Sequence, residues 1–163
     1  VSAEDAPSLE RVLGPLRDGP GPDEGGRKAL ARLEAAQDLA AALARIRAGE
    51  SVVACRDTLP QLQAAERQAL DTGCPASAPL VTQAQEAGAT VKTAVELQAR
   101  LVVARNGATL SDVTDAQLEV LRNALKAART AAPAVTALLG PDVQSAEAVE
   151  EQWAAVQELR RAQ

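Results

Sequence analysis

Apolar side chains recur every three or four residues along most of this chain, which is the spacing of one face of an α-helix. Glycines at positions 19, 49, 73, 107 and 140 each follow such a stretch, and a proline lies one or two residues beyond three of them. No stretch shows the alternation of a strand. We therefore predict an all-α fold without a sheet. The predicted helical segments cover residues 3–17, 24–48, 51–72, 78–105, 115–131 and 143–162, with a short helical turn over 134–139.

Local signals refine the ends and interiors of these segments. Residues 18–26 are rich in Gly and Pro and predict a flexible linker. Pro60 should kink or split the third segment, because proline lacks the N–H that a helix interior requires. Ser77 is a candidate N-cap for the fourth segment. Thr114 and Gln117 have the spacing of a capping box, which predicts a helix that begins directly after Thr114.

The fourth segment carries a seam of small side chains at alternating steps of four and three, as in a coiled coil. Its members are Val81, Ala84, Gly88, Val91, Val95, Gln98 and Val102. This seam can belong to the core of an elongated bundle of five to six helices, or it can pair with a second copy of the chain to give a homodimer. Gly88, Val91 and Val95 are therefore candidate interaction residues.

Trp153 is the one aromatic residue in a chain without Phe, Tyr, Met or His. Tryptophan is common at the energetic centres of protein interfaces, and its large side chain also fills cores. Two roles follow for Trp153, as the centre of a local core or as the anchor of an interface. The rest of the apolar content is Ala, Leu and Val, which predicts a thin core in slender helical layers.

The composition also limits the chemistry. Without histidine the chain can form neither a Ser–His or Cys–His catalytic arrangement nor a His-containing metal site. The Gly-rich linker lacks the Gly-Lys-Ser/Thr ending of a phosphate-binding loop. We therefore expect no enzymatic activity, no catalytic residue, no cofactor and no metal. A net charge of −5 argues against a nucleic-acid partner. No apolar run reaches the roughly 18 residues of a membrane span, so no membrane partner is expected.

The two cysteines, Cys55 and Cys74, indicate the compartment. A helix between them would hold the thiols roughly 20 Å or more apart. A disulfide needs Cα atoms within about 7 Å, and only a sharp fold-back at Pro60 would allow that. We expect two free thiols and hence a reducing, intracellular location.

The stretches QEAGATVKTAVELQARLVVARNG (85–107) and TDAQLEVLRNALKAARTAAPAV (114–135) carry a resemblance to a known family. In these stretches, and in its GC-rich style of composition, the chain resembles the central helical region of the herpesvirus large tegument protein. The resemblance implies a rod-like piece of a large scaffold that links the capsid to the outer tegument, in the virion and in the cytoplasm or nucleus of the host. The deubiquitinase of that family lies elsewhere, and none of its catalytic residues matches a position here.

Two hypotheses of function follow. The first is a structural scaffold or spacer segment, spanning residues 1–163 and cut from a longer protein, since the chain begins with Val. The alternative is a helical adaptor that binds a partner peptide or helix through an exposed apolar groove. Protein partners or self-association are expected in either case.

Overall fold

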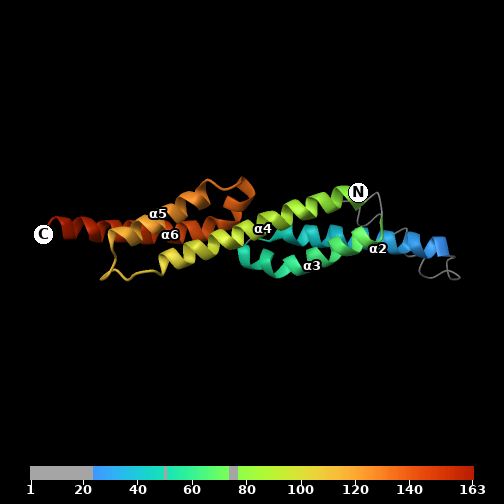
Figure 1. Ribbon diagram of the computed structural model, residues 1–163, viewed down its shortest axis with the longest axis horizontal. Helices are drawn as coiled ribbons and strands as arrows, with labels where there is room; N and C mark the ends of the chain where they lie inside the picture. Colours follow the sequence, from blue (N-terminus) through green and yellow to red (C-terminus); the bar gives the residue numbers. More distant parts are fainter. Residues whose placement is uncertain (1–23, 50, 74–76) are drawn as a thin grey trace. The chain divides into compact units, whose positions relative to one another are not determined.

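The computed structural model describes residues 24–49, 51–73 and 77–163. These residues form α2 (Glu24–Ala48), α3 (Val52–Asp71), α4 (Ala78–Arg105), α5 (Asp115–Arg129) and α6 (Pro133–Arg161) (Figure 1). Helix accounts for 87% of the described residues, and no strand occurs among them. The predicted all-α fold is confirmed. The predicted segment 3–17, linker residues 18–23 and Cys74 lie outside the described residues, whereas residues 24–26 form the first turn of α2.

The chain divides into two compact units, Val1–Ala89 and Thr90–Gln163. The division falls inside α4, so that this helix contributes its first turns to one unit and its last turns to the other. Gly88 directly precedes this boundary, but α4 continues through it without a break.

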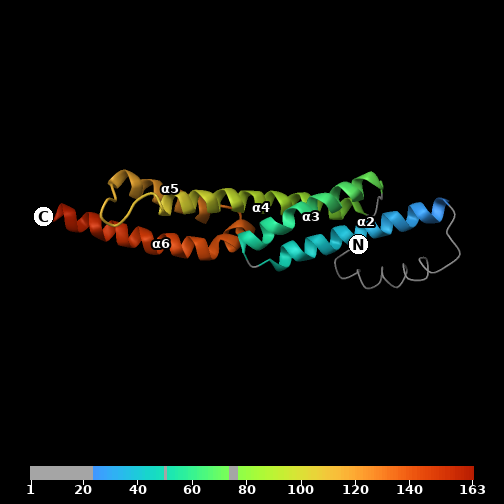
Figure 2. The ribbon, with the colours of Figure 1, turned by 90° about the horizontal axis from the view of Figure 1, so that it is seen from below.

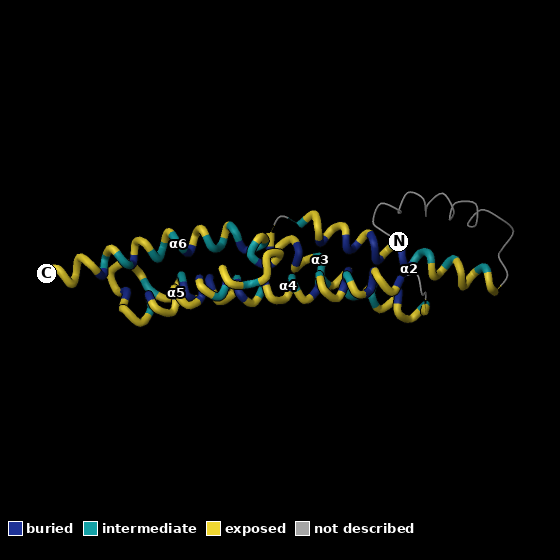
Figure 3. Tube along the Cα trace, turned by 90° about the horizontal axis from the view of Figure 1, so that it is seen from above, coloured by how far each residue is buried: buried dark blue, intermediate teal, exposed yellow. Residues whose placement is uncertain are grey.

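In the first unit α2 and α3 form an antiparallel hairpin (Figure 2). Polar side chains join the two helices at both ends. Arg32 Nε donates to the carbonyl of Thr72 at 3.1 Å, and Arg45 donates to Gln61 Oε1 at 2.9 Å. Buried positions recur in every turn along the second half of α2 and at wider spacing along α3 (Figure 3). The buried set is Ala35, Ala36, Leu39, Ala40, Ala42, Leu43 and Ile46 on α2, and Val52, Cys55, Leu62, Ala65 and Ala69 on α3.

In the second unit α5 and α6 form another antiparallel hairpin. Arg129 Nε donates to Glu147 Oε1 at 3.1 Å, and Arg122 Nε donates to Glu150 Oε1 at 2.8 Å. The last turns of α4 join α6 through a hydrogen bond from Gln98 to Asp142 at 2.8 Å. Largely apolar side chains make up the core of this hairpin: Leu118, Leu121, Ala124, Leu125 and Ala128 on α5, and Val135, Leu139, Ala146, Trp153 and Gln157 on α6.

Helix ends follow the sequence signals closely. The segments predicted over 24–48 and 78–105 match α2 and α4 in their bounds. Gly73 ends α3 with φ +59°, in the left-handed region that favours glycine, and its N–H donates to the carbonyl of Leu70. At the start of α5 the Thr114–Gln117 capping box is present in both directions.

One predicted interruption is wrong. Helix α6 runs through Gly140 and Pro141, where the sequence predicted a stop between two helical pieces. Of the two outcomes considered for Pro60, a kink or a split, the split does not occur, because α3 is one helix from Val52 to Asp71. Proline removes one hydrogen bond from a helix and crowds the residue before it. At Pro141 the preceding residue is glycine, which has no Cβ to be crowded. Buried residues on both sides, Leu139 and Ala146, favour one continuous helix over a break.

Candidate interaction surface

The residues predicted to form an interaction seam on α4 lie largely in the interior. Gly88 is buried, Val91 is 1% exposed, and Val95 is half-buried. Beyond Val91 the buried stripe departs from the predicted steps. It continues through Ala94, Leu97, Leu101 and Ala104, while Gln98 and Val102 are only half-buried. Leucine buries more apolar area than valine, so the face that carries the two leucines takes the core positions.

Trp153 is 2% exposed and therefore lies in the interior. It occupies the same face of α6 as Ala146 and Gln157, because residues three, four or seven apart along a helix share a face. Of the two roles considered for Trp153, this burial favours the core. The burial of Gly88 and Val91 likewise favours the internal alternative for the seam over pairing with a second copy.

An apolar groove lies between the second half of α4 and α5. It has a volume of about 480 Å³ and is lined by Ala99, Arg100, Val103, Ala104, Val120, Asn123, Ala124 and Ala127. Val103 is 72% exposed and Val120 is 58% exposed, although both belong to a residue type that is usually buried. Arg100 is the one charged residue in the lining.

The groove opens on the side of α4 that faces away from α6. Gln98 and Arg105 bond α6 through Asp142 and Ser145. At about 100° per residue, Arg105 points to nearly the opposite side of α4 from Val103. This surface was not predicted from the sequence. It could have been found from two valines, Val103 on α4 and Val120 on α5, that lie outside the apolar stripe predicted for the core of each helix.

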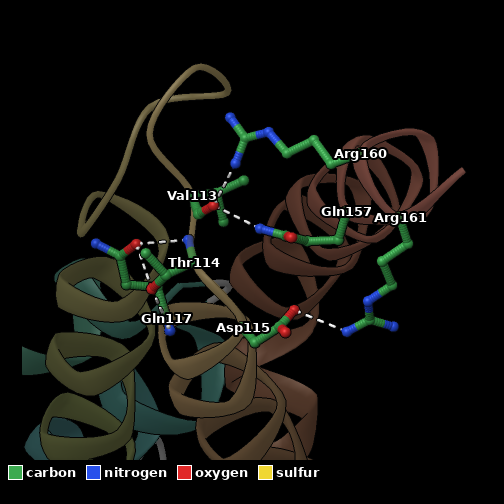
Figure 4. Close-up of polar contacts among 7 residues, drawn as sticks. All are labelled: Val113, Thr114, Asp115, Gln117, Gln157, Arg160 and Arg161. Carbon is green, nitrogen blue, oxygen red and sulfur yellow. Dashed lines mark hydrogen bonds and ion pairs between the residues drawn. The ribbon is translucent and has the colours of Figure 1, made fainter. Parts of the chain in front are cut away.

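At one end of the groove the connection between α4 and α5 is bound to the end of α6 (Figure 4). The carbonyl of Val113 accepts hydrogen bonds from Gln157 Nε2 and from Arg160, the latter at 2.8 Å. A second guanidinium nitrogen of Arg160 donates to the carbonyl of Ser111. Arg161 forms an exposed ion pair with Asp115 at 2.9 Å, one residue inside α5.

The same connection is also tied to the start of α5. The Gln117 side chain accepts a hydrogen bond from the Thr114 backbone N–H at 2.8 Å, and its amide nitrogen donates to the carbonyl of Gly107 at 2.9 Å. One glutamine therefore completes the capping box and also holds the end of α4. These contacts connect residues 107–114 to helices on both sides.

Two titratable side chains have shifted pKa values. Burial raises the pKa of the Cys55 thiol, whose Sγ lies 3.5 Å from the carbonyl oxygen of Ile46. Cys55 is a free cysteine. The hydrogen bond from Arg122 to Glu150 raises the pKa of that guanidinium. Neither residue borders the groove.

Within residues 24–49, 51–73 and 77–163, no group of three His, Cys, Asp or Glu residues has the placement to hold a metal ion. Across the same residues, no helix combines the length and apolarity that crossing a bilayer requires.

The fold and the groove together define an all-α helical bundle protein with an exposed apolar surface between two of its helices. No protein-family model, no curated protein and no solved structure matches the chain.

Proposed function

We propose that this chain is a non-catalytic scaffold or spacer segment. The observation that carries the proposal is that several of its polar side chains form hydrogen bonds between helices. Arg32 joins α2 to the end of α3, Arg129 joins α5 to α6, and Gln98 joins α4 to α6. Side chains engaged in helix–helix contacts stabilise a supporting structure.

The resemblance to the central helical region of the herpesvirus large tegument protein gives this proposal its most specific form. On that form the chain is a rod-like part of a large scaffold between capsid and outer tegument. The hairpin construction of each unit supports a spacer, because antiparallel helices with cores of Ala, Leu and Val make slender layers.

Small-angle scattering and analytical ultracentrifugation on the isolated chain test the spacer. We expect an elongated particle, with an axial ratio well above one, that keeps its helix content over a wide concentration range. A monomer with an axial ratio near one would contradict the proposal. Circular dichroism on the same sample verifies that the helices are formed, so that an expanded, unfolded chain is not mistaken for a rod.

A second candidate function is favoured by the groove between α4 and α5. Apolar grooves between helices bind amphipathic helices, and Val103 and Val120 are exposed at such a groove. As an adaptor, the chain would bind an apolar helical segment with an acidic residue opposite Arg100.

Methyl NMR tests the adaptor. An amphipathic helical peptide of Leu, Ala and Glu is titrated while the methyl signals of Val103 and Val120 are followed. We expect saturable shifts at both valines in the unmodified chain, and in Val103→Glu the remaining signal, that of Val120, should no longer shift. Val53→Glu is the matched control, because Val53 is also exposed but lies on α3, in the first unit. Shifts that do not saturate, or that survive Val103→Glu, would contradict an adaptor groove.

A further inference from the structure

Two different helices hold the connection between α4 and α5: Gln117 of α5 binds the Gly107 carbonyl at its start, and the end of α6 binds residues 111–113 at its other end. Val113 directly precedes the N-cap Thr114, so its carbonyl lies outside the hydrogen-bond ladder of α5, which begins with the Thr114 carbonyl bonded to the Leu118 N–H. Backbone carbonyls of this kind need a partner when they are buried. Gln157 and Arg160 of α6 supply it.

The other bonds within the connection are local. The Asp112 N–H donates to the carbonyl of Thr109, and the Thr109 hydroxyl contacts Ser111 and Asp112. These bonds shape the turn but do not attach it to a helix. At this end of the connection, the attachment consists of the Val113 side chain, which is buried, and the bonds from α6 to the carbonyls of Val113 and Ser111.

We propose that the last two turns of α6 act as a latch, by which we mean that Gln157 and Arg160 reversibly hold the α4–α5 connection in place. Arg160 and Gln157 hold residues 111–113 against α6, and loss of their hydrogen bonds lets these residues move away while helices α2 to α6 stay folded. The local opening removes the Val113 side chain, which is 1% exposed, from its buried site. It is a conformational switch that acts inside the second unit and does not depend on any ligand of the groove.

The chemistry of the latch distinguishes it from a surface ion pair. Arg160 donates to two neutral carbonyl groups through the fork of its guanidinium, whereas Arg161 binds a carboxylate, Asp115, with both side chains about two-thirds exposed. Salt screens exposed pairs of opposite charge strongly. Closure of the latch should therefore be nearly insensitive to salt, in contrast to the neighbouring pair.

Hydrogen exchange on the full chain tests the latch. The reporters are the backbone amides of Asp112 and Thr114, whose hydrogen bonds lie within or next to the connection. The reference is the Thr72 amide in the first unit, which bonds to the Gln68 carbonyl. Arg160→Ala should accelerate exchange at the two reporters about tenfold or more and leave the reference unchanged, because each hydrogen bond to a charged group has a sizeable net free energy.

Arg161→Ala is the matched control, an adjacent arginine that makes no bond to the connection's carbonyls. It should change exchange at the reporters by less than about threefold, because exposed ion pairs contribute little. Arg160→Lys should give an intermediate rate, since an ammonium lacks the planar fork that reaches both carbonyls.

Three results would overturn the latch. The first is equal acceleration by Arg160→Ala and Arg161→Ala. The second is acceleration of the Thr72 reference together with the reporters, which indicates global unfolding. The third is an unchanged rate in Arg160→Ala and in Gln157→Ala alike. Acrylamide quenching of Trp153, the one tryptophan, gives an independent readout, because Trp153 lies one turn before Gln157 on the same face of α6. Quenching should rise in Arg160→Ala under native conditions.

Discussion

A methyl group added at Gly49 would meet a buried sulfur. Gly49 directly follows α2, and its N–H donates to the carbonyl of Ile46 at 3.2 Å, which holds its backbone in place. A Cβ at this position would lie 2.5 Å from the Sγ of Cys55, a side chain that is 0% exposed. Gly49 does not have a positive φ, so the conflict comes from space and not from backbone strain. We predict that Gly49→Ala destabilises the first unit by about 1–3 kcal/mol, the range for overpacking.

Removal of the sulfur should relieve this conflict. Cys55→Ala alone loses one buried heavy atom and a weak S–H hydrogen bond, a loss of about 1 kcal/mol by analogy with small core truncations. In the double variant the new methyl group occupies space that the sulfur has vacated. The two changes should therefore couple favourably by about 1–2 kcal/mol, within the range for residues in contact.

Urea unfolding followed by circular dichroism measures the four free energies of this cycle. Fluorescence of Trp153, in the second unit, shows whether that unit is affected. Gly88→Ala is the matched control, because its Cβ would lie 3.7 Å from Leu59 Cδ1, an ordinary contact, inside helix α4. It should gain about 0.5–1 kcal/mol, because alanine is the better helix former. Additive effects of Gly49→Ala and Cys55→Ala, or the same sign for both glycine variants, would refute the reasoning.

Three further outcomes are expected. Burial raises the pKa of the Cys55 thiol above its ordinary 9.0, so the unfolded state loses this proton at lower pH than the folded state does. The free energy of unfolding of the first unit should therefore fall as pH rises through and above 9. In Cys55→Ala the urea midpoint, measured at a series of pH values over that range, should no longer show this fall. Thr114→Ala removes the N-cap of α5 and should reduce the free energy of unfolding by about 1 kcal/mol, seen as a lower thermal midpoint. Val91→Glu places a charge in the core and should cause the loss of much of the helix content, as measured by circular dichroism, whereas Val103→Glu should keep the helix content. An equal loss of helix content in both variants would contradict the burial of Val91.

Helix positions were predictable from the sequence because their signals are local. The bounds of α2 and α4 and the capping box of α5 depend on residues within one or two turns of each end. The predicted stop at Pro141 was wrong for the same reason. The local preference at Pro60 and Pro141 is to interrupt a helix, but apolar residues on both sides are buried in continuous helices, and tertiary burial overrides a local preference.

The attachment of the α4–α5 connection could not be predicted. The carbonyl of Val113 and its partners Gln157 and Arg160 are 44 and 47 positions apart in the sequence. Every residue has a backbone carbonyl, so the residue type does not reveal which carbonyl accepts such a bond. Gln and Arg near the end of a helix are commonly exposed to solvent. By sequence alone the arginines at 160 and 161 are equivalent, since both are basic residues in the last turn of a helix and favourable to its dipole. The fold distinguishes them, because one binds carbonyls and the other a carboxylate.

The groove exists because α4 carries more apolar residues than one core-facing side can bury, and the sequence alone does not show which of them are buried. Two apolar stripes are available after Val91, one through Val95 and Val102 and one through Leu97 and Leu101, and a single helix cannot turn both fully to the same core. The leucines take the core, and Val103 is left exposed on the outer face. Its substitution removes little buried area, so a stability measurement says nothing about its role. An effect of Val103→Glu on peptide binding, with folding intact, is therefore the observation that would distinguish a binding surface from an incidental exposed valine.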